Sequence, residues 1–198
     1  MDRRTLLRAA GLGVIAGAPG CTSFLTSEDT APVLWVSAQP TVPDRFDTTI
    51  TVSKLSGVTE QRTATIEIMV RNERAAPRTY VGGSSFPFVG TSTPTGLVVL
   101  DHSTTDGEGS DDCWSVDPAG WHMNATATEL TGGEAVRPQF GVWDDGAISG
   151  CFEPGQYRFS DTMAVQNADG TTTSIEWGFT IGVARGTTKE SDRNPEQA

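Results

Sequence analysis

The chain has 198 residues, of which 36% are hydrophobic and 8% aromatic. This length leaves room for one ordinary domain with its own core once an N-terminal segment and a tail are set aside. Acidic residues outnumber basic ones by 25 to 14, and no cluster of Lys and Arg follows residue 8. Because nucleic-acid binding needs a basic patch that displaces counterions, the composition excludes nucleic acid as a partner.

The first twenty residues are typical of an export signal. Arg3 and Arg4 precede a short apolar run, residues 9–18, which contains three glycines. The run is far shorter than the roughly 20 apolar residues of a membrane-spanning helix. It resembles the twin-arginine signals that are removed after export, which implies the twin-arginine export machinery as a partner. A disordered basic N-terminus is the alternative.

Cys21 follows this signal directly. Small residues precede it, and the junction resembles a lipobox, except that Ala18 stands where the family pattern has leucine. By this resemblance Cys21 carries the lipid that anchors the protein to the outer side of the cell membrane. The alternative is ordinary cleavage that leaves Cys21 as a free or paired thiol. Residues 21–32 then form a polar, lipidated tether, and residues 186–198 form a disordered polar tail.

The mature chain is strongly acidic. Loss of residues 1–20 removes one acidic and three basic residues, so the net charge falls from −11 to −13. Lys54 and Lys189 are the only lysines, and the other basic residues are arginines. Acidic, lysine-poor surfaces stay hydrated in molar salt, and in this respect the chain resembles haloarchaeal proteins. The alternative is an acidic protein from moderate salt.

Between residues 33 and 185 the hydrophobic period is two, which is typical of strands with one buried and one solvated face. Predicted strands include residues 50–52, 64–70, 136–142, 157–165 and 175–183. Asn167 to Gly170 predicts a hairpin turn between the last two strands. With no long helical pattern, seven to nine short strands predict a single all-β domain, an antiparallel sandwich over residues 33–185.

Two segments resemble the immunoglobulin-like domains of bacteria and archaea. The string Cys151 to Phe159 contains a Pro-Gly-x-Tyr stretch that opens the penultimate strand in that family, and Ile66 to Tyr80 resembles its middle hairpin. The order of Gly133-Glu134, Trp143 and Pro-Gly-x-Tyr is also similar to a proteinase-inhibitor-like sandwich family. That resemblance implies an alternative function, the inhibition of a protease. The inhibitory segment would be a rigid protruding loop at residues 83–96, with Phe86, Pro87 and Pro94.

The cysteine count supports a disulfide. If Cys21 carries lipid, Cys113 and Cys151 remain as an even pair in an oxidising exterior. We therefore predict a bond between them. A reactive Cys113 or Cys151 beside a base is the alternative.

An acidic, glycine-rich loop is the candidate cation site. Its carboxylates are Asp101, Asp106, Glu108, Asp111 and Asp112. Calcium prefers several oxygen ligands from a flexible loop, although the spacing here is not that of an EF-hand. A solvated acidic loop without a metal is the alternative.

Other candidate sites are single residues. His102 and His122 are twenty positions apart, and no Gly-x-Ser-x-Gly elbow presents a serine, so a zinc site or a hydrolase centre is weakly supported. Asn124 lies in a glycosylation sequon. Three tryptophans, at positions 114, 121 and 143, either fill a core beside the disulfide or form an exposed carbohydrate or peptide platform.

Taken together, these patterns predict a lipid-anchored, extracytoplasmic β-sandwich without a cofactor. Its expected role is that of a non-catalytic surface or binding module for an unknown protein or small ligand. A proteinase-inhibitor-like module is the alternative, followed by a secreted hydrolase or a cation-binding protein.

Overall fold

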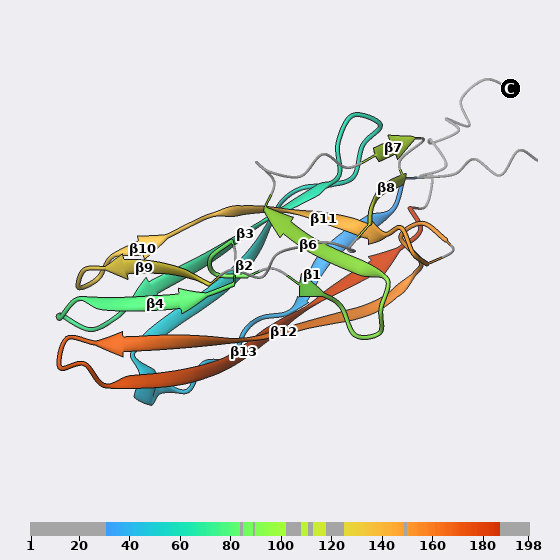
Figure 1. The fold of residues 1–198 in the computed structure, drawn as a ribbon. Coiled ribbons are helices and arrows are strands. Elements are labelled where there is room, and N and C mark those ends of the chain that lie inside the picture. The colour runs from blue at the N-terminus through green and yellow to red at the C-terminus, as the bar shows by residue number, and fades with distance from the viewer. Residues whose placement is uncertain are drawn as a thin grey trace, which may run out of the picture.

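The computed structural model describes residues 31–83, 85–88, 90–101, 108–110, 113–117, 125–148 and 150–186. These residues form thirteen strands and one short 3-10 helix, with no α-helix among them (Figure 1). The elements are β1 (Val33–Ala38), η1 (Asp44–Phe46), β2 (Thr48–Ser56), β3 (Ala64–Asn72), β4 (Arg78–Gly82), β5 (Gly90–Thr91), β6 (Leu97–Asp101), β7 (Glu108–Ser110), β8 (Cys113–Val116), β9 (Thr126–Leu130), β10 (Ala135–Val136), β11 (Gln139–Asp145), β12 (Gly155–Asn167) and β13 (Thr172–Ala184). No helix in these ranges has the length and apolar character needed to cross a membrane.

Two sheets lie face to face. The five-stranded sheet has the order β1-β13-β12-β4-β9, and the eight-stranded sheet follows β10-β3-β11-β6-β5, with β2 beside β3 and β7-β8 beside β11. All pairs are antiparallel except β8 with β11. The all-β sandwich is therefore confirmed. Its strand count exceeds the predicted seven to nine because β5, β7, β8 and β10 are two to four residues long, too short to show alternation in sequence.

The inward faces of both sheets follow the predicted alternation. The buried positions include Ala64, Ile66, Ile68 and Val70 in β3; Tyr157, Phe159, Met163 and Val165 in β12; and Ile175, Trp177, Phe179, Ile181 and Val183 in β13. The predicted run 136–142 is divided into β10 and β11 at Arg137 and Pro138. Proline has no N–H to give to a ladder, and here its carbonyl accepts the N–H of Ile68 at 3.1 Å.

β12 and β13 form a long hairpin along one side of the molecule (Figure 1). The predicted turn joins them: Gly170 has a φ of 82° and donates its N–H to the carbonyl of Asn167 at 2.9 Å. Positive φ is a conformation that glycine adopts without cost. The pairing continues without a register shift from Gly155 opposite Val183 to Gln166 opposite Thr172.

The segment between β4 and β6 turns into the sandwich. Phe86 and Phe88 are only 8% and 1% exposed, and Pro87 between them is also buried. The Phe86 ring lies against that of Tyr80, with centroids 6.4 Å apart. The prediction that Phe86 and Pro87 stand on a protruding loop is therefore wrong, because these rings fill the space between the two sheets.

Residues 72–77 connect the two sheets and do not form the expected hairpin. β3 belongs to the eight-stranded sheet and β4 to the five-stranded one, so they are not paired. The amide of Asn72, which is fully buried, organises this crossover. Its Nδ2 donates to the carbonyls of Ala76, Leu130 and Thr131 at 2.9, 3.1 and 3.2 Å, and its Oδ1 accepts the N–H of Arg74 at 3.1 Å.

Replacement of Asn72 by alanine is expected to lower the free energy of unfolding by about 2–3 kcal/mol, because buried backbone groups lose their partners. Urea unfolding of the variant measures this loss. As a control, Gln166→Ala removes an exposed amide near the end of β12 and should cost less. An Asn72→Ala loss no larger than that of the control would contradict the role assigned to the buried amide.

The β7-β8 end of the eight-stranded sheet covers part of the outer face of β6 and β11 and forms a third, smaller layer there. Outward-facing Val98, Leu100 and Trp143 are buried there beneath Trp114 and Val116 of β8. The indole rings of Trp114 and Trp143 meet edge-on, with their centroids 6.2 Å apart. Trp114 Nε1 also donates to the carbonyl of Thr59 at 2.8 Å. This layer confirms the core role predicted for two of the three tryptophans.

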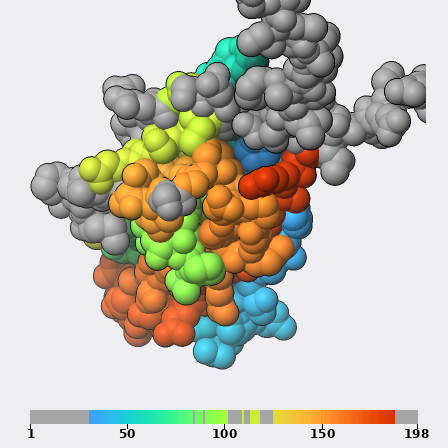
Figure 2. Space-filling view, turned by 90° about the vertical axis from the view of Figure 1, so that its right-hand side faces the viewer, coloured from blue at the N-terminus to red at the C-terminus, as the bar shows by residue number. Residues whose placement is uncertain are grey.

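The predicted disulfide fastens this layer to the sandwich. Cys113 at the start of β8 is bonded to Cys151 in the loop that leads to β12. Figure 2 shows this end of the molecule, where the yellow-green residues of β7 and β8 lie against the orange residues of the neighbouring segment. Cys151 also packs against the main core. The bond therefore joins the outer layer to the interior.

Candidate functional site

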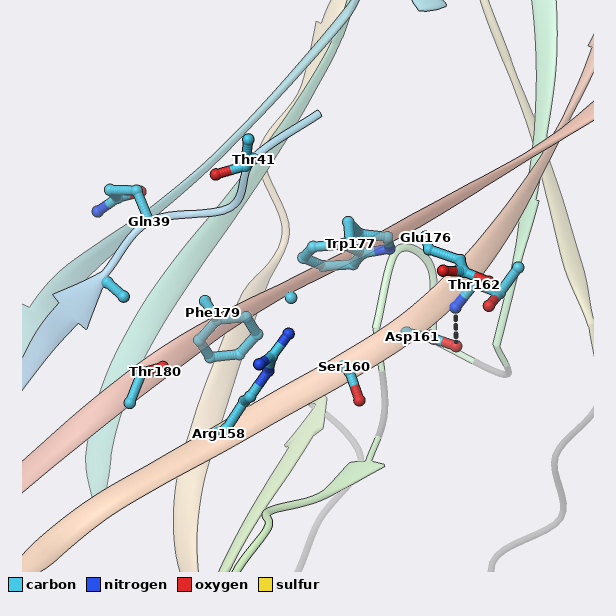
Figure 3. A pocket seen from close by; sticks show the side chains of 12 residues that line it. Gln39, Thr41, Arg158, Ser160, Asp161, Thr162, Glu176, Trp177, Phe179 and Thr180 are labelled. Carbon is cyan, nitrogen blue, oxygen red and sulfur yellow. Dashed lines mark hydrogen bonds between the residues drawn. The ribbon is translucent and has the colours of Figure 1, made fainter. Parts of the chain in front are cut away.

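A groove of about 640 Å³ lies on the five-stranded sheet, beside the place where β1 ends. We call it the outer-face groove. It is lined by Ala38, Gln39, Thr41, Arg158, Ser160, Asp161, Thr162, Glu176, Trp177, Gly178, Phe179 and Thr180. Figure 3 shows how β12 and β13 contribute the floor, while the segment after β1 contributes the opposite wall.

Outward-facing side chains of β12 and β13 form three cross-strand rows in the groove. Arg158 lies opposite Thr180, Ser160 opposite Gly178, and Thr162 opposite Glu176. Successive rows are about 6.6 Å apart because each strand residue advances about 3.3 Å. The charges of Arg158 and Glu176 therefore stand at opposite ends, with small or hydroxyl-bearing side chains between them.

Gly178 keeps the middle of the groove open. A Cβ at this position would lie 2.4 Å from the carbonyl oxygen of Phe159 in the neighbouring strand. Such a contact is too close for any side chain, so the sequence requires glycine here. The absent side chain leaves a hollow between Ser160 and the segment that follows β1.

The wall of the groove is fixed by Gln39. β1 is paired with β13 as far as Ala38 opposite Thr180, after a register shift, and the chain then leaves the sheet. The Gln39 side chain bonds both backbone groups of Val52 in the other sheet: Nε2 donates to the carbonyl at 2.7 Å and Oε1 accepts the N–H at 2.9 Å. This amide holds the crossing segment in place, so the wall is preformed.

The polar groups at the two ends of the groove are free to bind a ligand. Within the described residues, the side chains of Arg158 and Glu176 form no hydrogen bond or ion pair, and neither do the hydroxyls of Ser160 and Thr162. Burial raises the pKa of Asp161, although the N–H of Thr162 donates to its carboxylate at 2.7 Å. The groove thus combines one cation, carboxylates and hydroxyls.

A second polar cluster lies at the end of the sandwich near the disulfide. Asp144 is 6% exposed, and its Oδ1 accepts the N–H of Phe152 at 2.9 Å. Burial raises its pKa to about 6, and the nearby charges of Asp145 and Glu153 act in the same direction. The Tyr157 hydroxyl donates to the carbonyl of Glu153 at 2.7 Å. Burial raises the pKa of Tyr157, and the carboxylates of Asp144 and Glu153 act in the same direction. The contacts of this cluster are internal to the fold.

Asp144 should make stability depend on pH. The pKa of Asp144 rises from 3.8 to about 6 on folding, so the folded state favours the protonated acid. The free energy of unfolding should therefore fall as pH rises from about 4 to 6. Asp144→Asn should therefore be more stable than the parent at pH 7, by about 1–2 kcal/mol after solvent screening, and similar to it below pH 4. Urea unfolding across this pH range measures the difference. Exposed Glu129→Gln is the control, and a constant offset for Asp144→Asn would contradict the assignment.

Most residues predicted as sites lie outside the described part of the chain. This is so for Arg3, Arg4, Cys21, His102, Asp106, Asp111, Asp112, His122 and Asn124. Of the acidic loop, the structure describes Asp101 at the end of β6 and the backbone of Glu108 in β7. Within the described ranges, no three His, Cys, Asp or Glu residues come together as a metal site. Export, lipidation, glycosylation and calcium binding thus stay predictions.

The groove residues were missed by sequence reasoning. Arg158, Ser160, Thr162 and Glu176 occupy the polar positions of two alternating strands, which carry no signal beyond that of a solvated face. A glycine in a strand interior, such as Gly178, is the one local signal of a close approach.

Comparison with protein-family models, curated proteins and solved structures finds no match for this chain.

Proposed function

We propose that this protein is a non-catalytic binding module on the outer side of a cell membrane, and that the outer-face groove is its ligand site. The observation that carries the proposal is a preformed groove whose charged ends, Arg158 and Glu176, have no partner among the described side chains. A preformed hollow with a cation at one end and a carboxylate at the other offers a polar ligand two fixed charged contacts.

The architecture supports binding rather than catalysis. The groove holds no histidine, cysteine or lysine, and its one carboxylate with a raised pKa, Asp161, bonds the N–H of the next residue. A general acid-base site would need a second titrating group directed at the same reacting atom. The other carboxylate, Glu176, belongs to the outward row of Thr162, whereas Asp161 pairs with Trp177, which faces inward. The groove instead offers hydrogen-bonding groups spread over three rows.

Blocking the groove tests this assignment. Ser160→Trp places a large side chain in the hollow beside Gly178 without altering the core. Thr172→Trp is a matched control on the same face of the hairpin, outside the groove. Saturation-transfer NMR on the full chain is measured with two soluble mixtures, one of short oligosaccharides and one of tryptic peptides. We expect a signal from one mixture that survives in the control and is lost in Ser160→Trp. No signal from either mixture, or equal signals from both variants, would overturn the proposal.

The location is proposed on separate grounds. The paired arginines Arg3 and Arg4, the short apolar run and the Gly-Cys junction support export and a lipid on Cys21. The disulfide between Cys113 and Cys151 suits an oxidising exterior. Cys21→Ser should move the protein from the detergent-extracted to the soluble fraction. Intact mass of the parent protein should show loss of residues 1–20 and a gain of lipid, and an unmodified chain beginning at Met1 would contradict the anchor.

A further inference from the structure

We infer that the ligand of the outer-face groove is a short oligosaccharide, one ring of which stacks on the indole of Trp35. The inference rests on the proposed function and names the class of ligand for the same site. It is carried by an exposed aromatic ring that continues the line of polar rows in the groove.

Trp35 lies flat on the outer face of the five-stranded sheet. Its partner in the pairing is Gly182, where a Cβ would lie 2.4 Å from Cε2 and Cζ2 of the indole. One face of the ring therefore covers the glycine backbone, while the residue as a whole is 39% exposed. The arrangement presents a planar apolar surface to solvent on a rigid strand.

This ring is in line with the groove. Gly182 also pairs with Gln156, which makes Trp35, Gly182 and Gln156 the row next to that of Arg158 and Thr180. Ser37 donates to Gln156 Oε1 at 2.5 Å. That bond leaves the Gln156 amide nitrogen beside the indole as a donor.

A saccharide matches this sequence of groups. Each sugar ring has a face of C–H groups, which stacks on an indole, and a rim of hydroxyls, which both donate and accept hydrogen bonds. The indole is followed by an amide, a guanidinium, two hydroxyls and a carboxylate, at Gln156, Arg158, Ser160, Thr162 and Glu176. Four rows at about 6.6 Å spacing give a track about 20 Å long, which suits several linked rings.

The chemistry favours a saccharide over a peptide. A peptide bound by its side chains would need apolar pockets along the track. The exposed side chains of the three groove rows are polar, and the rings of Trp177 and Phe179, which also line the groove, are only 4% and 2% exposed. Among the described residues, Trp35 presents the exposed aromatic ring in line with them. Peptide binding is nevertheless a distinct outcome of the test below.

Isothermal calorimetry in molar salt tests the inference with full-length protein and three probes: cellopentaose, mannopentaose and tetragalacturonate. We expect at least one probe to bind the parent protein and to bind Trp35→Ala about tenfold more weakly, with recovery in Trp35→Phe. Val33→Ala is the matched control, because Val33 is an exposed apolar residue on the same face of β1. Thermal unfolding confirms that each variant is folded.

The possible results separate the inference from the proposed function. Binding of no probe to a folded parent protein would overturn the inference, as would binding that Trp35→Ala leaves unchanged. If the peptide mixture alone binds in a manner sensitive to Ser160→Trp, the groove is the ligand site and the saccharide is wrong. If a probe binds and depends on Trp35 but not on Ser160→Trp, the indole is a saccharide site and the groove is not part of it.

Discussion

Phe88→Ala is expected to lower the free energy of unfolding by about 4 kcal/mol. Phe88 comes from the segment between β4 and β6, yet its ring is 1% exposed. It meets the rings of Phe159, Trp177 and Phe179 edge-on, with centroids 5.9, 5.6 and 5.4 Å away. Its loss leaves a cavity between two sheets whose strands hold the surrounding backbone in place, so the site cannot collapse freely.

Urea unfolding of Phe88→Ala and Phe88→Leu measures this effect. The leucine variant restores much of the volume and should lose clearly less stability than the alanine variant. Thr91→Ala changes an exposed residue of the same segment and should have little effect. A Phe88→Ala loss below about 1 kcal/mol would show that the ring does not close the core.

Removal of the disulfide by the double substitution Cys113→Ser and Cys151→Ser is expected to cost a similar amount. The two cysteines are 38 positions apart, and the chain-entropy estimate for a loop of this length is about 4 kcal/mol. The outer layer should also loosen, because β8 is held to β11 by only two paired positions. Trp114 and Trp143 would then report the change directly.

Two measurements check this second prediction. Chemical unfolding gives the loss of stability, and tryptophan fluorescence of the native state gives the increased exposure of the indoles. Dithiothreitol added to the parent protein should reproduce both effects, while it should leave the double variant unchanged. If the fluorescence is unaltered and the free energy of unfolding falls by less than about 1 kcal/mol, the disulfide does not hold the third layer in place.

The sequence was sufficient for the fold class because burial on one face leaves a clear alternation. β3 and β13 carry uninterrupted inward apolar runs and that of β12 is broken only at Asp161, so all three strands are predicted from alternation. The pairing of strands was harder to predict. β3 and β4 look like a hairpin in sequence, but the buried amide of Asn72 makes their connection a crossover, and an Asn in a turn is typical of both.

The candidate site was not predictable from the same pattern. The residues of the groove occupy the polar positions of alternating strands, and a ligand-binding strand face and an ordinary solvated one show the same alternation. The groove exists because β1 ends at Ala38 while β13 continues, and because Gln39 bonds the other sheet. Both facts concern contacts between distant parts of the chain. Trp35 gave no signal either, since its exposure depends on Gly182 across the sheet.

Amide chemical-shift mapping of the full-length protein tests the central claim most directly. The isotope-labelled chain is titrated with the oligosaccharide and peptide mixtures in turn, in molar salt. The account predicts that a ligand shifts the amides of residues 156–162 and 176–182 and of the segment near Gln39, and leaves those of β7 and β8 unchanged. Shifts confined to another surface, or none with either mixture, would contradict it.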